Sequence, residues 1–150
     1  MEKYDPKNAA KIWDRVQNPV FASGDAPAVL TLIAEEMQDS LAYGKLAKRL
    51  PPAQAAIARQ ISQQEQAHIS CLKGIYTLIT GRKAIVPPAV VSDDPPEIVL
   101  RRCYGREMRC LAQYEARMND PQYGYIFRKL AQQEQEHCRH ILEILGTLSK

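Results

Sequence analysis

The stretch R-Q-I-S-Q-Q-E-Q-A-H at residues 59–68 decides the fold, because it returns as R-K-L-A-Q-Q-E-Q-E-H at residues 128–137. Both copies read R-x-x-x-Q-Q-E-Q-x-H and lie in segments whose apolar residues have helical spacing. In each copy a Glu and a His are three residues apart, so their side chains share one face of an α-helix. A four-helix bundle builds a two-metal carboxylate site from two such pairs and one further Glu on each of the other two helices.

Prolines divide the chain into four predicted helices. Pro51-Pro52 ends one helix and starts the next, and Asn119-Asp120-Pro121 forms a second break, with Asp120 as N-cap and Pro121 at the first helical position. The predicted helices cover about residues 27–50, 52–80, 96–118 and 121–148, and the Pro-rich residues 81–95 connect the two halves. Residues 1–26 form an N-terminal segment in which Asn8 to Val16 could be a short helix. The fold class is therefore all-α, with two antiparallel helical hairpins in one domain.

The two further glutamates lie in a second pair of matching segments. Moving the first predicted helix forward by 71 positions places Glu36 on Glu107 and Tyr43 on Tyr114, so both helices read E-M-x-x-x-x-x-Y. Seven residues are about two helical turns, so each Glu and Tyr share a face. The Glu-x-x-His phrases are 69 positions apart, and a small change in hairpin length accommodates the difference. The chain is therefore an internal repeat of one helical hairpin.

Distances from the turns place the four glutamates at one level of the bundle. Two residues of an antiparallel hairpin lie at one level when they are equally far from the turn. The midpoint between positions 36 and 65 is 50.5, and that between positions 107 and 134 is 120.5, so both midpoints fall on the proline breaks. Each glutamate is then roughly 21 Å from its turn, at about 1.5 Å per residue. The Pro-rich connection, residues 81–95, extends by about 3.1 Å per residue and so reaches about the length of one helix. It can therefore run along the bundle as a crossover. It could instead reach a neighbouring chain and exchange hairpins between protomers.

Apolar residues bracket the predicted ligands at helical spacing. Ile61 and Leu72 continue the stripe that contains Glu65 and His68, and the second copy has the same pattern. The many glutamines around both phrases are also compatible with polar surface helices. Unpaired buried carboxylates are costly, however, so metal ligation explains their place in an apolar stripe better.

The sequence resembles the ferritin-like di-iron carboxylate proteins, and among them the rubrerythrin-like group, on four motifs that span residues 27 to 148. The resemblance implies a ferritin-like four-helix bundle. It also implies that Glu65 and Glu134 bridge two metal ions, and that Glu36 and Glu107 each bind one of them. One nitrogen per metal would come from His68 and His137. Tyr43 and Tyr114 would donate hydrogen bonds to carboxylates of the site.

Four carboxylates balance the charge of two divalent ions, and carboxylate-rich coordination suits iron or manganese. We expect two iron ions, with manganese or a mixed pair as the alternatives.

Two features depart from the rubrerythrin pattern. The four cysteines contain no C-x-x-C pair, so the chain has no rubredoxin module, and a separate partner such as a rubredoxin-like protein would supply electrons. Rubrerythrins also carry a further glutamate three residues after the ligand of the third helix, and here this residue is Cys110. Cys110 could be an inert core residue or a thiol exposed to redox chemistry. For all four cysteines we expect buried or half-buried thiols.

These features favour an oxidoreductase that reacts with H2O2 or O2 and takes electrons from an external donor. A ferroxidase or iron-storage protein and a non-catalytic metal-binding bundle are the alternatives. The net charge of +3 and the absence of basic runs argue against nucleic acid, and no apolar run is long enough for a membrane. The N-terminus lacks the apolar segment of a signal peptide, so we expect a cytoplasmic protein. We expect a homodimer, with or without hairpin exchange.

Overall fold

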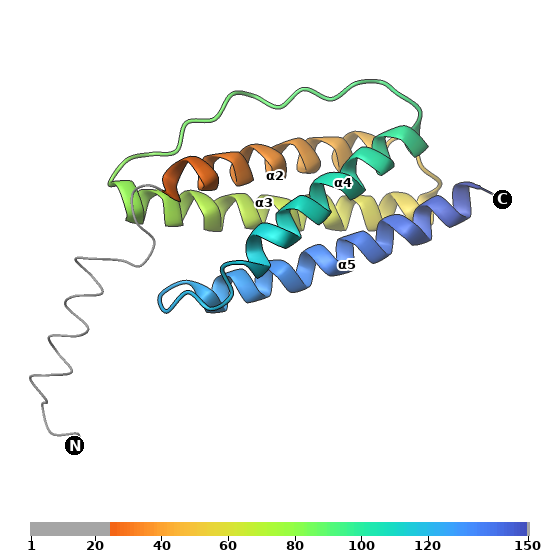
Figure 1. Cartoon of the computed structure of the whole chain (residues 1–150). Helices are drawn as coiled ribbons and strands as arrows, with labels where there is room; N and C mark the ends of the chain where they lie inside the picture. Colours follow the sequence, from red (N-terminus) through yellow and green to blue (C-terminus); the bar gives the residue numbers. More distant parts are fainter. Residues whose placement is uncertain (1–24, 150) are drawn as a thin grey trace, which may run out of the picture.

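The computed structural model describes residues 25–149, and in this part of the chain it contains four helices and no strand (Figure 1). The helices are α2 (Ala26–Leu46), α3 (Pro52–Thr80), α4 (Pro96–Glu115) and α5 (Gly124–Leu148). The predicted all-α four-helix bundle is therefore confirmed. The short helix considered between Asn8 and Val16 lies outside the described residues.

Three predicted helix ends are displaced by a few residues. α2 ends at Leu46 and α4 at Glu115, each followed by a short turn that was counted as helix. α5 begins at Gly124, so placing Pro121 at its first position was wrong. The Asp120 Oδ1 atom instead accepts the backbone N–H groups of Gln122 and Tyr123, both at 2.8 Å. The carboxylate therefore stabilises the turn before the helix, as aspartates often do.

The helices form two antiparallel hairpins, α2 with α3 and α4 with α5, and the hairpins pack through α2 on α4 and α3 on α5. Residues 81–95 run along α2 to the far end of the bundle, so α4 starts parallel to α3 (Figure 1). The Gln38 Nε2 atom donates to the Val90 carbonyl at 2.6 Å, and the Arg49 guanidinium donates to the Asp94 carbonyl at 2.8 Å. These bonds attach residues 81–95 to α2 and to the turn that follows α2 in the same chain.

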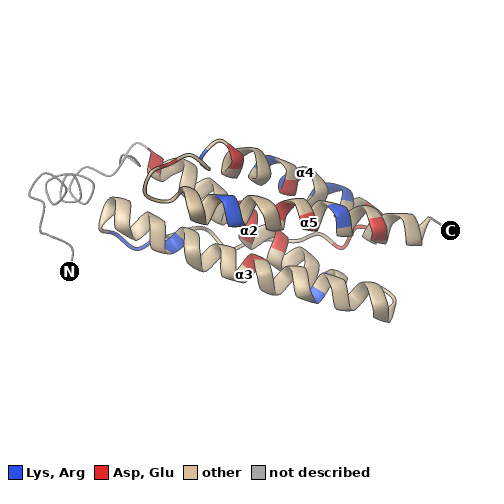
Figure 2. Cartoon of the chain, turned by 90° about the horizontal axis from the view of Figure 1, so that it is seen from below, with Lys and Arg blue, Asp and Glu red and all other residues tan. Residues whose placement is uncertain are grey.

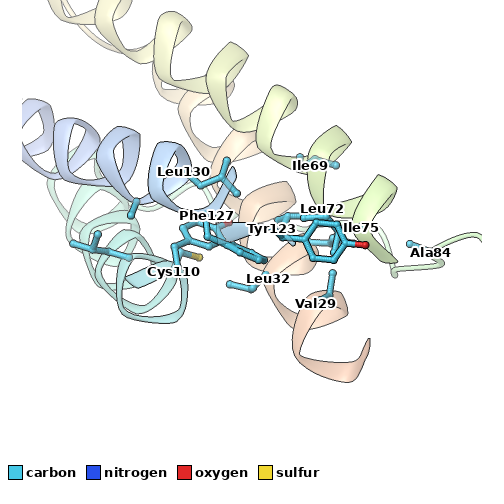
Figure 3. Close-up of a cluster of buried hydrophobic side chains, with 14 residues drawn as sticks. Val29, Leu32, Ile69, Leu72, Ile75, Ala84, Cys110, Tyr123, Phe127 and Leu130 are labelled. Carbon is cyan, nitrogen blue, oxygen red and sulfur yellow. The ribbon is translucent and has the colours of Figure 1, made fainter. Parts of the chain in front are cut away.

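Two apolar clusters fill the bundle interior. One contains Leu72 and Phe127 and is drawn in Figure 3, where side chains from all four helices meet. The other contains Leu46, Leu100 and Ile141 near the opposite end. Each large apolar side chain in these clusters contributes about 1.5–3 kcal/mol through burial. The level of the predicted ligands lies between the clusters, so it is shielded from water along the bundle axis.

None of the described helices is both long and apolar enough to cross a membrane.

Candidate metal centre

Midway along the bundle, the six predicted ligands come together in the interior. One glutamate comes from each helix and the two histidines come from α3 and α5, and acidic positions meet in the middle of the bundle in Figure 2. Each of these residues is 0–1% exposed. Burying an uncompensated carboxylate costs several kcal/mol, so four of them at one level require positive charge between them. The six residues are Glu36, Glu65, His68, Glu107, Glu134 and His137.

The donor atoms fall into two overlapping groups, each of which could hold a metal ion. The first consists of Glu36, Glu65, His68 and Glu134, and its donor atoms lie within 4.8 Å of one another. The second keeps Glu65 and Glu134 and adds one glutamate and one histidine from the second hairpin, Glu107 and His137. Glu65 and Glu134 are therefore common to both groups, and the other four residues each belong to one group.

Orphaned polar atoms at the centre fit this interpretation. Both carboxylate oxygens of Glu65 and of Glu134 are buried without a hydrogen bond in the described part of the chain. The same holds for His68 Nδ1, although it lies 3.0 Å from Glu134 Oε1 and 3.4 Å from Glu65 Oε2. Buried polar atoms are nearly always satisfied, so several unpartnered atoms at one point fit a metal-binding site. Three oxygens and one nitrogen per ion match the ligands that iron and manganese accept.

Two glutamines orient the histidines, and sequence reasoning missed them. His68 Nε2 lies 2.6 Å from Gln133 Oε1, and His137 Nε2 lies 2.6 Å from Gln64 Oε1. An amide oxygen only accepts, so Nε2 carries the proton in both rings and Nδ1 faces the carboxylates. The available signal was that each glutamine directly precedes the glutamate in both copies of the repeated phrase.

Both predicted tyrosines donate to site carboxylates, and they do so across the hairpins. The Tyr43 hydroxyl donates to Glu107 Oε1 at 2.9 Å, and the Tyr114 hydroxyl donates to Glu36 Oε1. Each tyrosine is 0% exposed. Since Glu36 and Glu107 each accept a hydrogen bond from a tyrosine of the other hairpin, the geometry of the site depends on the packing of both hairpins.

The buried charges shift the pKa values of the site residues in both directions. Burial, then the contact with Glu107 and the charge of Glu65, raise the pKa of Glu134 well above its ordinary value. Burial also raises the pKa of Glu65, but contacts with His137 and His68 outweigh it and lower the pKa to about 2. Burial lowers the pKa of His137, but contacts with Glu107 and Glu65 raise it to about 9. Metal binding would therefore displace protons from this cluster.

A fifth buried carboxylate, Asp39, lies one helical turn beyond Glu36 and was not predicted. Arg106 Nε donates to Asp39 Oδ1 at 2.5 Å, and Asp39 is 1% exposed. Burial, then the charge of Glu107, raise the pKa of Asp39 to about 8 against the lowering effect of Arg106. The spacing of three residues from Glu36 was the signal, because it places both carboxyl groups on one face. The internal repeat aligns Asp39 with Cys110, so corresponding positions carry a carboxylate and a thiol.

The cysteines divide into three buried thiols and one exposed thiol. Cys110 is 1% exposed and packs in the cluster of Phe127, and burial raises its pKa, so the thiol stays protonated. Its position fits an inert core residue. Cys103 and Cys138 are also buried, but Cys71 is exposed. The prediction of four buried or half-buried thiols was therefore wrong for Cys71, because the residue lies on α3 outside both apolar clusters.

No protein-family model matches the chain, and neither a curated protein nor a solved structure is significantly similar to it. The interpretation of the site therefore rests on its own geometry.

Proposed function

We propose that this protein is a di-iron oxidoreductase of rubrerythrin type, which reduces peroxide or O2 with electrons from a separate donor. The observation that carries the proposal is the pair of overlapping donor groups that share Glu65 and Glu134. A structural site for one metal needs a single closed set of ligands, whereas shared carboxylates serve two ions at once. The four glutamates would neutralise two divalent ions, and this charge balance would offset the free-energy cost of burying the carboxylates.

Two iron ions bound here would cycle between the divalent and trivalent states and supply the two electrons that reduce peroxide. With two protons from solvent, these electrons would convert one peroxide molecule into two water molecules, and the external donor would replace the two electrons. Iron and manganese both accept this ligand set, and iron is the first choice because its divalent state reacts readily with peroxide.

The residues of the chain would act by holding and orienting the ligands. Glu65 and Glu134 would fix the spacing of the two ions. Gln64 and Gln133 would keep the Nδ1 atoms of the histidines directed at the ions, through Nε2 contacts of 2.6 Å. The tyrosine hydroxyls would hold the terminal glutamates, and the apolar clusters at both ends of the site would exclude water.

The test compares the wild-type protein with Glu65→Ala and with Glu136→Ala, a matched control because Glu136 is exposed on α5. Elemental analysis of freshly purified wild type should give about two metal ions per chain. The iron-loaded protein should consume peroxide when supplied with an electron donor, and Glu65→Ala should lose both the metal and the activity. Unchanged metal content in Glu65→Ala would refute the proposal.

Sizing in solution addresses the alternative of iron storage. A large closed assembly that accumulates many iron ions per chain would favour storage. A dimer with two ions per chain would favour the oxidoreductase.

A further inference from the structure

A pocket of about 260 Å³ lies between α3 and α5, directly against the histidine side of the candidate metal centre. His68 forms part of its wall, together with both glutamines that orient the histidines, Gln64 and Gln133. The pocket therefore borders the site at His68 and is lined by the two glutamines that contact the histidines. No role in the proposed reaction accounts for it.

Three of the residues that line this pocket carry hydrogen-bond donors. Gln64 and Gln133 use their Oε1 atoms for the histidines, so their Nε2 amino groups remain to donate. Within residues 25–149, neither amino group donates a hydrogen bond to another residue. Lys129 also lines the pocket, and no described acidic residue pairs with it. Two amides and one ammonium group, with no carboxylate in the lining, match a ligand that carries an anionic acceptor.

The rest of the lining is apolar or aromatic. Ala67 and Leu130 form the wall, and Tyr125 lies at the edge with 72% of its surface exposed. A tyrosine with this exposure offers a face on which a planar ring can stack. At about 30 Å³ for each water-sized group, the volume holds on the order of eight or nine non-hydrogen atoms. An apolar pocket with a few convergent polar groups is the usual form of a small-molecule site.

We propose that this pocket binds a small aromatic carboxylate. The carboxylate would accept hydrogen bonds from the Gln64 and Gln133 amino groups and pair with the Lys129 ammonium group. The ring would pack on the apolar wall and against Tyr125. Binding itself does not require a metal ion, although the ligand would lie beside the proposed di-iron site as a substrate or an effector.

Cys71 provides the readout, because it also lines the pocket and is the exposed cysteine of the four. The full-length protein is treated with iodoacetamide, and alkylation of Cys71 is followed by mass spectrometry with increasing benzoate. Benzoate should slow alkylation saturably, by at least about threefold. Benzyl alcohol, which has the ring but no carboxylate, should give little protection.

Substitution of Lys129 tests the recognition of the charge. In Lys129→Gln the benzoate concentration that gives half protection should rise by about tenfold, the loss expected for one charge-assisted hydrogen bond. Lys45→Gln, on α2 and away from this pocket, should behave as wild type. Lys129 is exposed, so folding should be retained, and circular dichroism verifies this.

Three results would overturn the proposal. One is the absence of saturable protection by benzoate, and another is equal protection by benzyl alcohol and by benzoate in Lys129→Gln. The third is protection that disappears when bound metal is removed with a chelator, because benzoate would then be a metal ligand. If the protein holds no metal but protection persists, the pocket assignment stands and the proposed di-iron function fails separately.

Discussion

Replacing Glu65 by glutamine should abolish binding of both metal ions, because this carboxylate belongs to both donor groups. Glutamine keeps the size of the side chain and removes one negative charge, so the interior packing is retained. Glu36 belongs to one group only, so Glu36→Gln should lose one ion and keep the other. The number of ions lost therefore distinguishes a bridging ligand from a terminal one.

The expected change in melting temperature follows from the linkage between metal binding and folding. A ligand present at 100 times its dissociation constant stabilises the folded state by about 2.7 kcal/mol per site, so two ions give about 5 kcal/mol. For a domain of this length, each kcal/mol raises the melting temperature by about 2–4 °C. Metal should therefore raise the melting temperature of the wild type by about 10–20 °C. The increment should be near zero in Glu65→Gln and about half the wild-type value in Glu36→Gln.

The assay is thermal unfolding by circular dichroism, with and without added Fe²⁺ under anaerobic conditions, combined with elemental analysis. Glu136→Gln makes the same charge change at an exposed position of α5 and should keep the full increment. The reasoning is refuted if Glu65→Gln retains more than half of the wild-type increment. It is also refuted if Glu136→Gln loses the increment, because a general charge effect would then explain the data.

Three further predictions concern the surroundings of the site and the turn before α5. Tyr43→Phe removes the donor 2.9 Å from Glu107 Oε1 and should cost about 1–3 kcal/mol of unfolding free energy in urea titration; an unchanged midpoint would contradict it. The pKa of His137 is raised to about 9, so metal binding must displace a proton, and metal affinity should strengthen about tenfold per pH unit between pH 6.5 and 8.5 in chelator competition. In the metal-free protein the folding stability should change in the opposite direction with pH. The stability that protonated His137 contributes is complete below about pH 6.5 and is lost as pH rises through 9. A metal affinity that is the same at all pH values would exclude the coupling between metal binding and this proton. Gly124→Ala places a Cβ atom 2.5 Å from the Met118 carbonyl oxygen, so it should destabilise the protein by about 1–3 kcal/mol, and a melting temperature at or above that of the wild type would show that the turn relaxes freely.

The helices and the composition of the site could be predicted because both depend on local spacing. Residues three, four or seven positions apart share a helix face whatever the rest of the chain does. The repeated phrase and the two proline breaks therefore sufficed to place Glu36, Glu65, Glu107 and Glu134 at one level. Helix ends were less certain, because a turn such as the one after Asp120 competes with the first turn of the helix on nearly equal terms.

Contacts between helices could not be predicted in the same way. Whether Tyr43 donates to the glutamate of its own hairpin or of the other one depends on the rotation and crossing of packed helices, which sequence spacing does not specify. The position of Gln64 on α3 is also compatible with a solvent-exposed side chain. Only the packing of α5 against α3 brings His137 to the Gln64 amide. The ion pair of Asp39 and Arg106 likewise exists only because α2 packs on α4.

Helical spacing within each segment was enough to predict a duplicated helical hairpin, its proline-marked turns and six inward Glu and His residues at one level. Only the packed helices show which groups contact those residues, which carboxylates are common to both donor groups, and that a pocket lined by Gln64 and Gln133 lies beside His68. These features arise from side chains of different helices, and their positions are set by the packing of the two hairpins against each other.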